Sequence, residues 1–150
     1  MDYKTMVCEA MSNYTFIKVS IDNMRYAITH DFEPRGLSGL SYDRDVVQTS
    51  TITSETESDG IRLADSKTKL ERELKVNESL IKKLDRCIES LPPKHRELIT
   101  LKYIRCKSGK EIADEMGYSV SHCKRIHQGA IYKMSVGMYG LRAVRNKTEN

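Results

Sequence analysis

Between Leu63 and Leu91 the chain carries a seam of apolar residues spaced mostly three or four positions apart, and this seam constrains the fold more than any other feature. Its members are Leu63, Leu70, Leu74, Asn77, Ile81, Leu84, Ile88 and Leu91. This spacing is typical of a helix that packs along another helix. Asn77 is a polar residue inside the seam, where it can fix the register at some cost in stability. Two partners stay open: an N-terminal helix of the same chain, or a second copy in a dimer.

A second apolar stripe, with helical spacing, covers residues 2 to about 30. It consists of Met6, Ala10, Tyr14, Ile17, Ile21, Met24 and Ile28. We expect a helix there, although residues 15–21 also place β-branched side chains at alternate positions, which leaves a strand open for residues 14–21. Residues 33–61 are rich in Ser, Thr and Gly, with few large apolar side chains to offset their ordering entropy.

These patterns predict an all-α protein in five segments. They are an N-terminal helical segment (1–32), a flexible polar linker (33–61), a long heptad-like oligomerisation helix (62–91), a helix-turn-helix domain (92–140) and a basic tail (141–150). The N-terminal helix and the long helix are expected to form a helical hairpin or coiled coil. Pro92 and Pro93 end the long helix and open the next one, because proline is tolerated only in a first turn.

The charge of the chain is uneven along its length. Residues 1–60 hold 5 Lys and Arg against 10 Asp and Glu, whereas residues 92–150 hold 12 against 5. The C-terminal part is therefore where a polyanion would bind. No apolar run reaches the roughly 18 residues of a membrane span, and no signal-peptide pattern opens the chain, so we expect a cytoplasmic protein with no membrane partner.

The stretch "SGKEIADEMGYSVSHCKRIHQGAIYKM" contains two helix starts with a stop between them. Ser108 and Glu111 match a capping box at the first start. Gly117 suits the left-handed position after a helix end, and Ser119 is the second candidate N-cap. Two helices joined by a short glycine-containing turn describe a helix-turn-helix, whose second helix enters the major groove of DNA.

The second of these helices has two different sides. Cys123, Ile126, Ala130 and Met134 recur at helical spacing and are expected to face the core. The opposite side carries donors of the types that pair with guanine, adenine or phosphate. The candidate DNA-binding residues are Ser119, Ser121, His122, Lys124, Arg125, Gln128, Lys110 and Lys133.

The segment from about residue 91 to residue 134 resembles region 4 of sigma factors. More narrowly, the chain resembles phage transcriptional regulators of the ArpU/RinA type, through "LSYD" at Leu40–Asp43 and through Arg125–His127 followed three residues later by Ala130. Gly109 and Cys123 depart from that family, which has a bulky aromatic and an aliphatic residue there. The resemblance implies a sequence-specific DNA-binding regulator of phage or prophage genes, a late-gene activator in the cytoplasm of a bacterial host.

No residue pattern supports catalysis, because paired-carboxylate, GxSxG and phosphate-loop motifs are all absent from the sequence. Cys123 and His127 are four residues apart but lack further ligands nearby, and the four cysteines form no CxxC pair. We therefore expect no enzyme, no cofactor and no metal. The expected partners are double-stranded DNA, RNA polymerase as a further candidate, and a second copy, in a homodimer or higher homo-oligomer.

Two other functions stay open at this point. A sigma-like adaptor would use the same module to bind RNA polymerase. A small DNA-recognition subunit of a phage packaging motor would also join a helix-turn-helix to helical oligomerisation elements, although such subunits usually carry the DNA module first.

Overall fold

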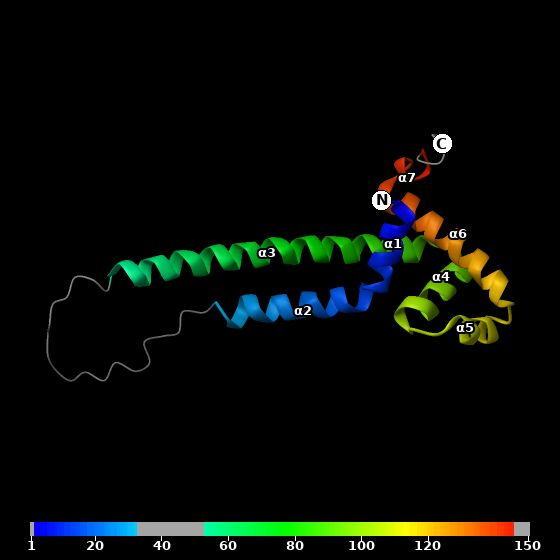
Figure 1. Cartoon of the computed structure of the whole chain (residues 1–150), viewed down its shortest axis with the longest axis horizontal. Coiled ribbons are helices and arrows are strands. Elements are labelled where there is room, and N and C mark those ends of the chain that lie inside the picture. The colour runs from blue at the N-terminus through cyan, green and yellow to red at the C-terminus, as the bar shows by residue number, and fades with distance from the viewer. Residues whose placement is uncertain (1, 33–52, 146–150) are drawn as a thin grey trace. The chain divides into compact units, whose positions relative to one another are not determined.

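In the computed structural model, the residues that are described (2–32 and 53–145) form helices joined by turns, and they include no strand (Figure 1). The elements are α1 (Tyr3–Ser12), α2 (Tyr14–His30), α3 (Thr53–Ser90), α4 (Pro93–Ile99), the π-helical segment η1 (Thr100–Ile104), α5 (Gly109–Met116), α6 (Val120–Tyr139) and α7 (Arg142–Arg145). The all-α prediction is confirmed for this part of the chain, and residues 14–21 are helical. Two compact units are formed: Met1–Val19 with Glu78–Asn150 (unit 1), and Ser20–Asn77 (unit 2).

Unit 2 is a helical hairpin made by the later turns of α2 and the first part of α3, which run side by side in opposite directions (Figure 1). Ile21 is buried, and the Nδ2 of Asn77 lies 4.0 Å from the Sδ of Met24, a long and weak contact. The seam on α3 and the stripe on α2 therefore meet within one chain. Leu63, at the start of the seam, keeps 46% of its surface exposed.

The long helix begins at Thr53, earlier than residue 62, where the sequence predicted its start. Residues 53–61, assigned to the linker, are therefore helical. The sequence predicted a flexible linker here because these residues have little apolar surface to bury. A helix that already exists, however, extends at the cost of ordering one residue for each new backbone hydrogen bond. The rest of the predicted linker, residues 33–52, lies outside the described part of the chain, as does "LSYD".

In unit 1 the N-terminal segment is broken at Asn13, so that one predicted helix becomes two. Asn13 has φ −95° and ψ 2°, in the bridge region between helix and strand, and it ends α1. The break changes which side of α1 is covered: Val7 and Met11 are buried in place of the expected Met6 and Ala10. In α2 the predicted side of the helix is covered, since Tyr14 and Ile21 are both buried. The Tyr14 hydroxyl donates to Oδ1 of Asp85 at 2.7 Å.

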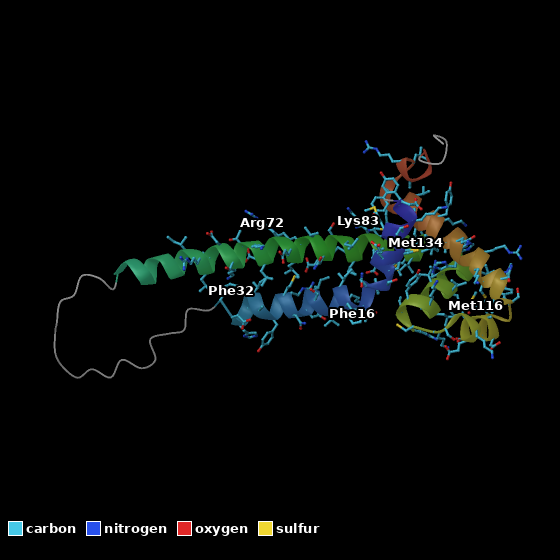
Figure 2. All side chains as sticks on the ribbon, in the orientation of Figure 1. Phe16, Phe32, Arg72, Lys83, Met116 and Met134 are labelled. Carbon is cyan, nitrogen blue, oxygen red and sulfur yellow. The ribbon has the colours of Figure 1, made fainter. Side chains whose placement is uncertain are left out.

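Helix α1 packs against α6, a contact that the sequence did not predict. The rings of Tyr3 and Tyr139 lie 4.9 Å apart, and the Nζ of Lys4 lies 5.6 Å from the ring centre of Tyr132. Met134 of α6, labelled in Figure 2, is completely buried. The N-terminal end of the chain thus supports the helix that carries the candidate DNA-binding residues.

The connection from α3 to α5 departs from regular helix twice. Arg96 of α4 donates from Nη2 to the carbonyl oxygens of Glu89 and Leu91, which satisfies acceptors left free where α3 ends. After α4 the backbone widens: the N–H of Arg105 bonds the carbonyl of Thr100, five residues back, at 2.9 Å. The helix predicted to run to about Arg105 is therefore α-helical to Ile99 and π-helical over η1.

Gly137 marks a close approach of α6 to α3. A Cβ at Gly137 would lie 2.9 Å from the Sγ of Cys87. We expect Gly137→Ala to lower the free energy of unfolding by about 1–2 kcal/mol, because the overpacking penalty exceeds the gain in helix propensity. Urea denaturation followed by circular dichroism measures the change. Adding Cys87→Ala should restore most of the loss.

Gly109→Ala is the matched control, because a Cβ at Gly109, in the same unit, meets no atom within 4 Å. It should leave the free energy of unfolding unchanged or raise it slightly. If Gly137→Ala were as stable as this control, the close approach of the two helices would be wrong.

Candidate nucleic-acid interface

Two helix starts and one glycine stop shape the helix-turn-helix. Ser108 and Glu111 form the predicted capping box: the Ser108 N–H donates to Oε2 of Glu111 at 2.7 Å, and the Glu111 N–H donates to Oγ of Ser108 at 3.4 Å. Hydrogen bonds to the Glu111 carboxyl from the Ser108 side chain, and secondly from its backbone N–H, lower the pKa of that carboxyl. Gly117 ends α5 with φ 67° and ψ 31°, and the His122 N–H donates to Oγ of Ser119 at 3.2 Å where α6 begins. The predictions for all three positions are confirmed.

A small core joins the helices of this unit. Its buried members are Leu98, Leu101, Ile112, Ala113, Cys123 and Ile126, with Met116 and Tyr118 packed against them. Cys123 and Ile126 come from α6, so this side of the helix is committed to the core. In a helix with 3.6 residues per turn, the two residues between them, Lys124 and Arg125, then point away from the core.

The exposed side of α6 carries Ser121, Lys124, Arg125 and Gln128, which we call the front face. Gln128 is four residues after Lys124 and three after Arg125, so the three side chains are neighbours on one helix surface. Within the described residues, no hydrogen bond or ion pair engages Lys124, Arg125 or Gln128. The predicted base-reading residues are therefore brought together and left accessible.

Ser119 and His122 have structural partners at the start of α6. The Ser119 hydroxyl is occupied as the N-cap, although the residue is exposed. His122 is half-buried, with its ring edge-on to Tyr118 at 4.8 Å. The Nζ of Lys94 lies 5.5 Å from the centre of the Tyr118 ring, and its hydrogen bond with Tyr118 raises the pKa of Lys94. His122 is thus less available to DNA than the front face.

The two remaining predicted lysines lie apart from the front face. Lys110 is exposed in the first turn of α5. Lys133 is exposed on α6, about 13 Å along the axis from Lys124 and about half a turn around the helix. Its charge, together with burial as the larger cause, lowers the pKa of the neighbouring His95. The structure therefore does not place Lys133 with the base-reading residues.

His127 joins α6 to η1 in an arrangement that the sequence did not predict. Its Nε2 lies 2.9 Å from the hydroxyl of Tyr103 and 3.2 Å from the Nζ of Lys102. An ammonium group can only donate, so Nε2 accepts and the imidazole is neutral. Burial, and secondly the charge of Lys102, lower the pKa of His127 to about 4. Lys102 and Tyr103 belong to the π-helical turn η1, and the sequence contains no clear signal that predicts this turn.

A cleft of about 260 Å³ lies between η1, the start of α5 and the front of α6. Leu98, Ile112, Val120 and Cys123 contribute apolar lining, while Lys102, Lys107 and Lys124 contribute charge. Lys107 forms an ion pair with Glu115. Lys102 has a neutral histidine beside it instead, and Lys124 has no ion-pair partner among the described residues. The cleft therefore adds one positive charge without an ion-pair partner beside the front face, that of Lys102, which was not among the predicted residues.

Within residues 2–32 and 53–145, no group of three or more His, Cys, Asp and Glu side chains is arranged to hold a metal ion. In the same part of the chain, no helix combines the length and the apolar character needed to cross a membrane.

The comparison with protein families bears directly on this geometry. Residues 81–134 match the family model for sigma-70, region 4. The match covers 54 of the 150 residues and contains α4, η1, α5 and the front face of α6. We call residues 81–134 the region 4-like module; together with its helix-turn-helix geometry, the match indicates DNA binding in transcription regulation. No curated protein and no solved structure matches the chain.

The half-buried neutral imidazole of His127 makes the stability of the region 4-like module depend on pH. The folded pKa of His127, about 4, lies below the ordinary histidine value of roughly 6.5. Between these values the unfolded chain binds a proton that the folded chain excludes, so the free energy of unfolding falls as the pH drops from about 6.5 and levels off below about 4. We expect His127 to contribute a loss of about 1–2 kcal/mol, because water screens part of the effect at a half-buried ring.

Denaturant titrations at several pH values between 7 and 4 measure this dependence. His127→Gln cannot titrate and should flatten the curve. The remaining slope includes His95, whose pKa is also lowered. His30→Gln, at an exposed position on α2, serves as the matched control and should keep the wild-type slope. An unchanged slope in His127→Gln would contradict the assignment of the neutral imidazole.

Proposed function

We propose that this chain is a sequence-specific regulator of transcription in a phage or prophage, of the ArpU/RinA type, that binds double-stranded DNA and activates late genes in the bacterial cytoplasm. The region 4-like module supports the DNA-binding part of the proposal. The resemblance at Leu40–Asp43 and at Arg125–His127 supports the phage part.

One observation supports recognition of a DNA sequence by α6. Lys124, Arg125 and Gln128 are exposed on one side of this helix, have no partner among the described residues, and lie opposite its buried side. A side chain that already had an internal partner would have to lose it before contacting a base. These three have no such partner, so no internal contact has to be broken, and only their dehydration and their conformational entropy oppose the contact.

The chemistry of the front face suits base edges in the major groove. Arg and Lys donate to O6 and N7 of guanine, and Gln pairs with N6 and N7 of adenine. Arg125, near the helix front, is the best placed for a bidentate contact, because its planar guanidinium presents two parallel donors. Ser121 is short and fits a contact to phosphate or to a base lying close to the helix.

Charge supplies the part of the affinity that does not depend on sequence. Residues 92–150 carry 12 Lys and Arg against 5 Asp and Glu. Lysines bound to phosphates release counterions, so binding should weaken steeply with salt. We propose that the protein acts by binding alone, with no catalytic step and no cofactor.

We further propose that it works as a homodimer through its helical segments. The exposed Leu63 at the start of the seam supports an additional contact surface on α3. Sedimentation of the full chain, with Leu63→Lys for comparison, tests the dimer separately from DNA binding. A chain that stays monomeric at high concentration would refute it.

Substitutions on and off the front face separate base reading from phosphate contact. Arg125→Ala should lower specific binding about 10-fold or more, and non-specific binding far less, because a lost bidentate base contact is worth about 1–3 kcal/mol. Lys110→Ala and Lys133→Ala should lower both kinds of binding to the same extent, and each should reduce the salt slope by about one.

Selection from random duplexes with the full chain supplies the specific sequence, and fluorescence anisotropy at several salt concentrations gives both affinities. If no sequence were enriched, the regulator function would be refuted. If Arg125→Ala lowered both kinds of binding equally, the base-reading role of Arg125 would be wrong while DNA binding stood.

The region 4 match also supports a second function, a sigma-like adaptor that binds RNA polymerase. A pull-down with core polymerase, carried out after nuclease treatment, separates the two functions. Polymerase retained without DNA would favour the adaptor. Polymerase lost together with the DNA would leave DNA binding as the function of the module.

A further inference from the structure

Val120 is an apolar side chain among the polar donors at the start of α6. It is the first residue of the helix and keeps 43% of its surface exposed. Its neighbours Ser119 and Ser121, and Lys124 one turn later, are all exposed and polar. A duplex docked on the front face would therefore also cover Val120.

The helix start and the buried core explain only part of the choice of valine at this position. Ser119 already caps the helix by accepting from the His122 N–H. The core is supplied from α6 by Cys123 and Ile126, and Val120 is not among its buried members. Valine also has a slightly lower helix propensity than straight-chain residues. A polar residue would serve the helix start equally well, so the exposed part of the Val120 side chain is left without an internal role.

The surroundings of Val120 favour a fixed orientation. Its side chain lines the cleft together with Ile112 and Cys123, so one side has apolar neighbours and the other faces solvent. A β-branched side chain has few rotamers to lose on binding. Val120 thus presents a methyl group at the start of α6, and its side chain would lose little conformational entropy on binding.

The major groove offers an apolar partner for such a group, the C5-methyl of thymine. Val120 and Lys124 are four residues apart on one face of α6, which is about 6 Å along the axis. Base pairs are stacked about 3.4 Å apart. The two side chains therefore reach bases within about two pairs of each other.

We propose that Val120 contacts the C5-methyl of a thymine, and that this thymine, within about two base pairs of the base contacted by Lys124, is part of the recognised sequence. The inference rests on the proposed function and adds a residue that determines specificity. The start of α6 would then recognise bases in two ways, by hydrogen bonds from Lys124 and Arg125 and by an apolar contact from Val120.

The test removes methyl groups from each partner in turn: the C5-methyl of one thymine from the duplex, and the two γ-methyl groups of Val120 from the protein. The duplex selected from a random pool by the full chain is resynthesised with each thymine replaced singly by deoxyuridine, which lacks the C5-methyl and keeps its pairing edge. For the wild-type protein, one replacement should weaken binding about fourfold, which is what one methyl group removed from water contributes. For Val120→Ala, the thymine and uracil duplexes should bind equally.

Val76→Ala is the matched control, since it makes the same change at a 66% exposed position on α3 outside the region 4-like module. It should keep the fourfold difference. The inference is overturned if no uracil replacement weakens wild-type binding, or if the difference persists in Val120→Ala.

Failure of the inference is distinguishable from failure of the proposed function. A pool in which no sequence is enriched would overturn both. A selected sequence that binds the wild type tightly but is indifferent to the thymine methyl would overturn only the role of Val120. Circular dichroism and the urea midpoint of Val120→Ala, both expected to match the wild type, show that any loss arises at the contact.

Discussion

Ala130 and Met134 expose none of their surface, and the burial of one side of α6 is the constraint on which the rest of the interface depends. A helix side chain cannot be moved to another face without rotating the whole helix, and rotation would withdraw these residues from a close-packed interior. Removing one large apolar side chain from such a core costs about 2–5 kcal/mol. The orientation of Lys124, Arg125 and Gln128 is thus set by residues on the opposite, buried side of the helix.

The positive charges of unit 1 differ in how far they are free to act on a polyanion. Lys107 is paired with Glu115, which also lies 3.8 Å from Arg105. Lys102 is held by a neutral imidazole, which positions the ammonium group without cancelling its charge. A neutral partner is a better support than a carboxylate for a lysine that binds phosphate, because no ion pair has to be broken first. The widened turn of η1 is what brings Lys102 and His127 together.

Features with local causes could be predicted from the sequence. The capping box at Ser108, the left-handed Gly117 and the cap at Ser119 each depend on a few adjacent residues and set where α5 and α6 begin and end. The apolar spacing along α6 then gave its exposed side. The contact of Tyr3 with Tyr139 could not be predicted in this way, because its partners lie at opposite ends of the chain. The one-residue change of buried face in α1 arises from the backbone at Asn13, which no spacing rule detects. For the site, the front face was predictable, whereas Lys102, Tyr103 and Lys107 depended on a π-helical turn and a cleft.

Helix α1 adds contacts to α6 that lie outside the region 4-like module. That module ends at residue 134, whereas α6 continues to Tyr139, and the extra turns are where Tyr3 packs. Tyr103 interacts with Cys8 of α1 while its hydroxyl contacts His127 of α6; burial, and secondly the cysteine, raise the pKa of Tyr103. A ligand that binds only the folded state stabilises every part that folds with its site. If the front face binds DNA as proposed, the duplex should therefore also stabilise the docking of α1 without touching it, because both depend on the same position of α6.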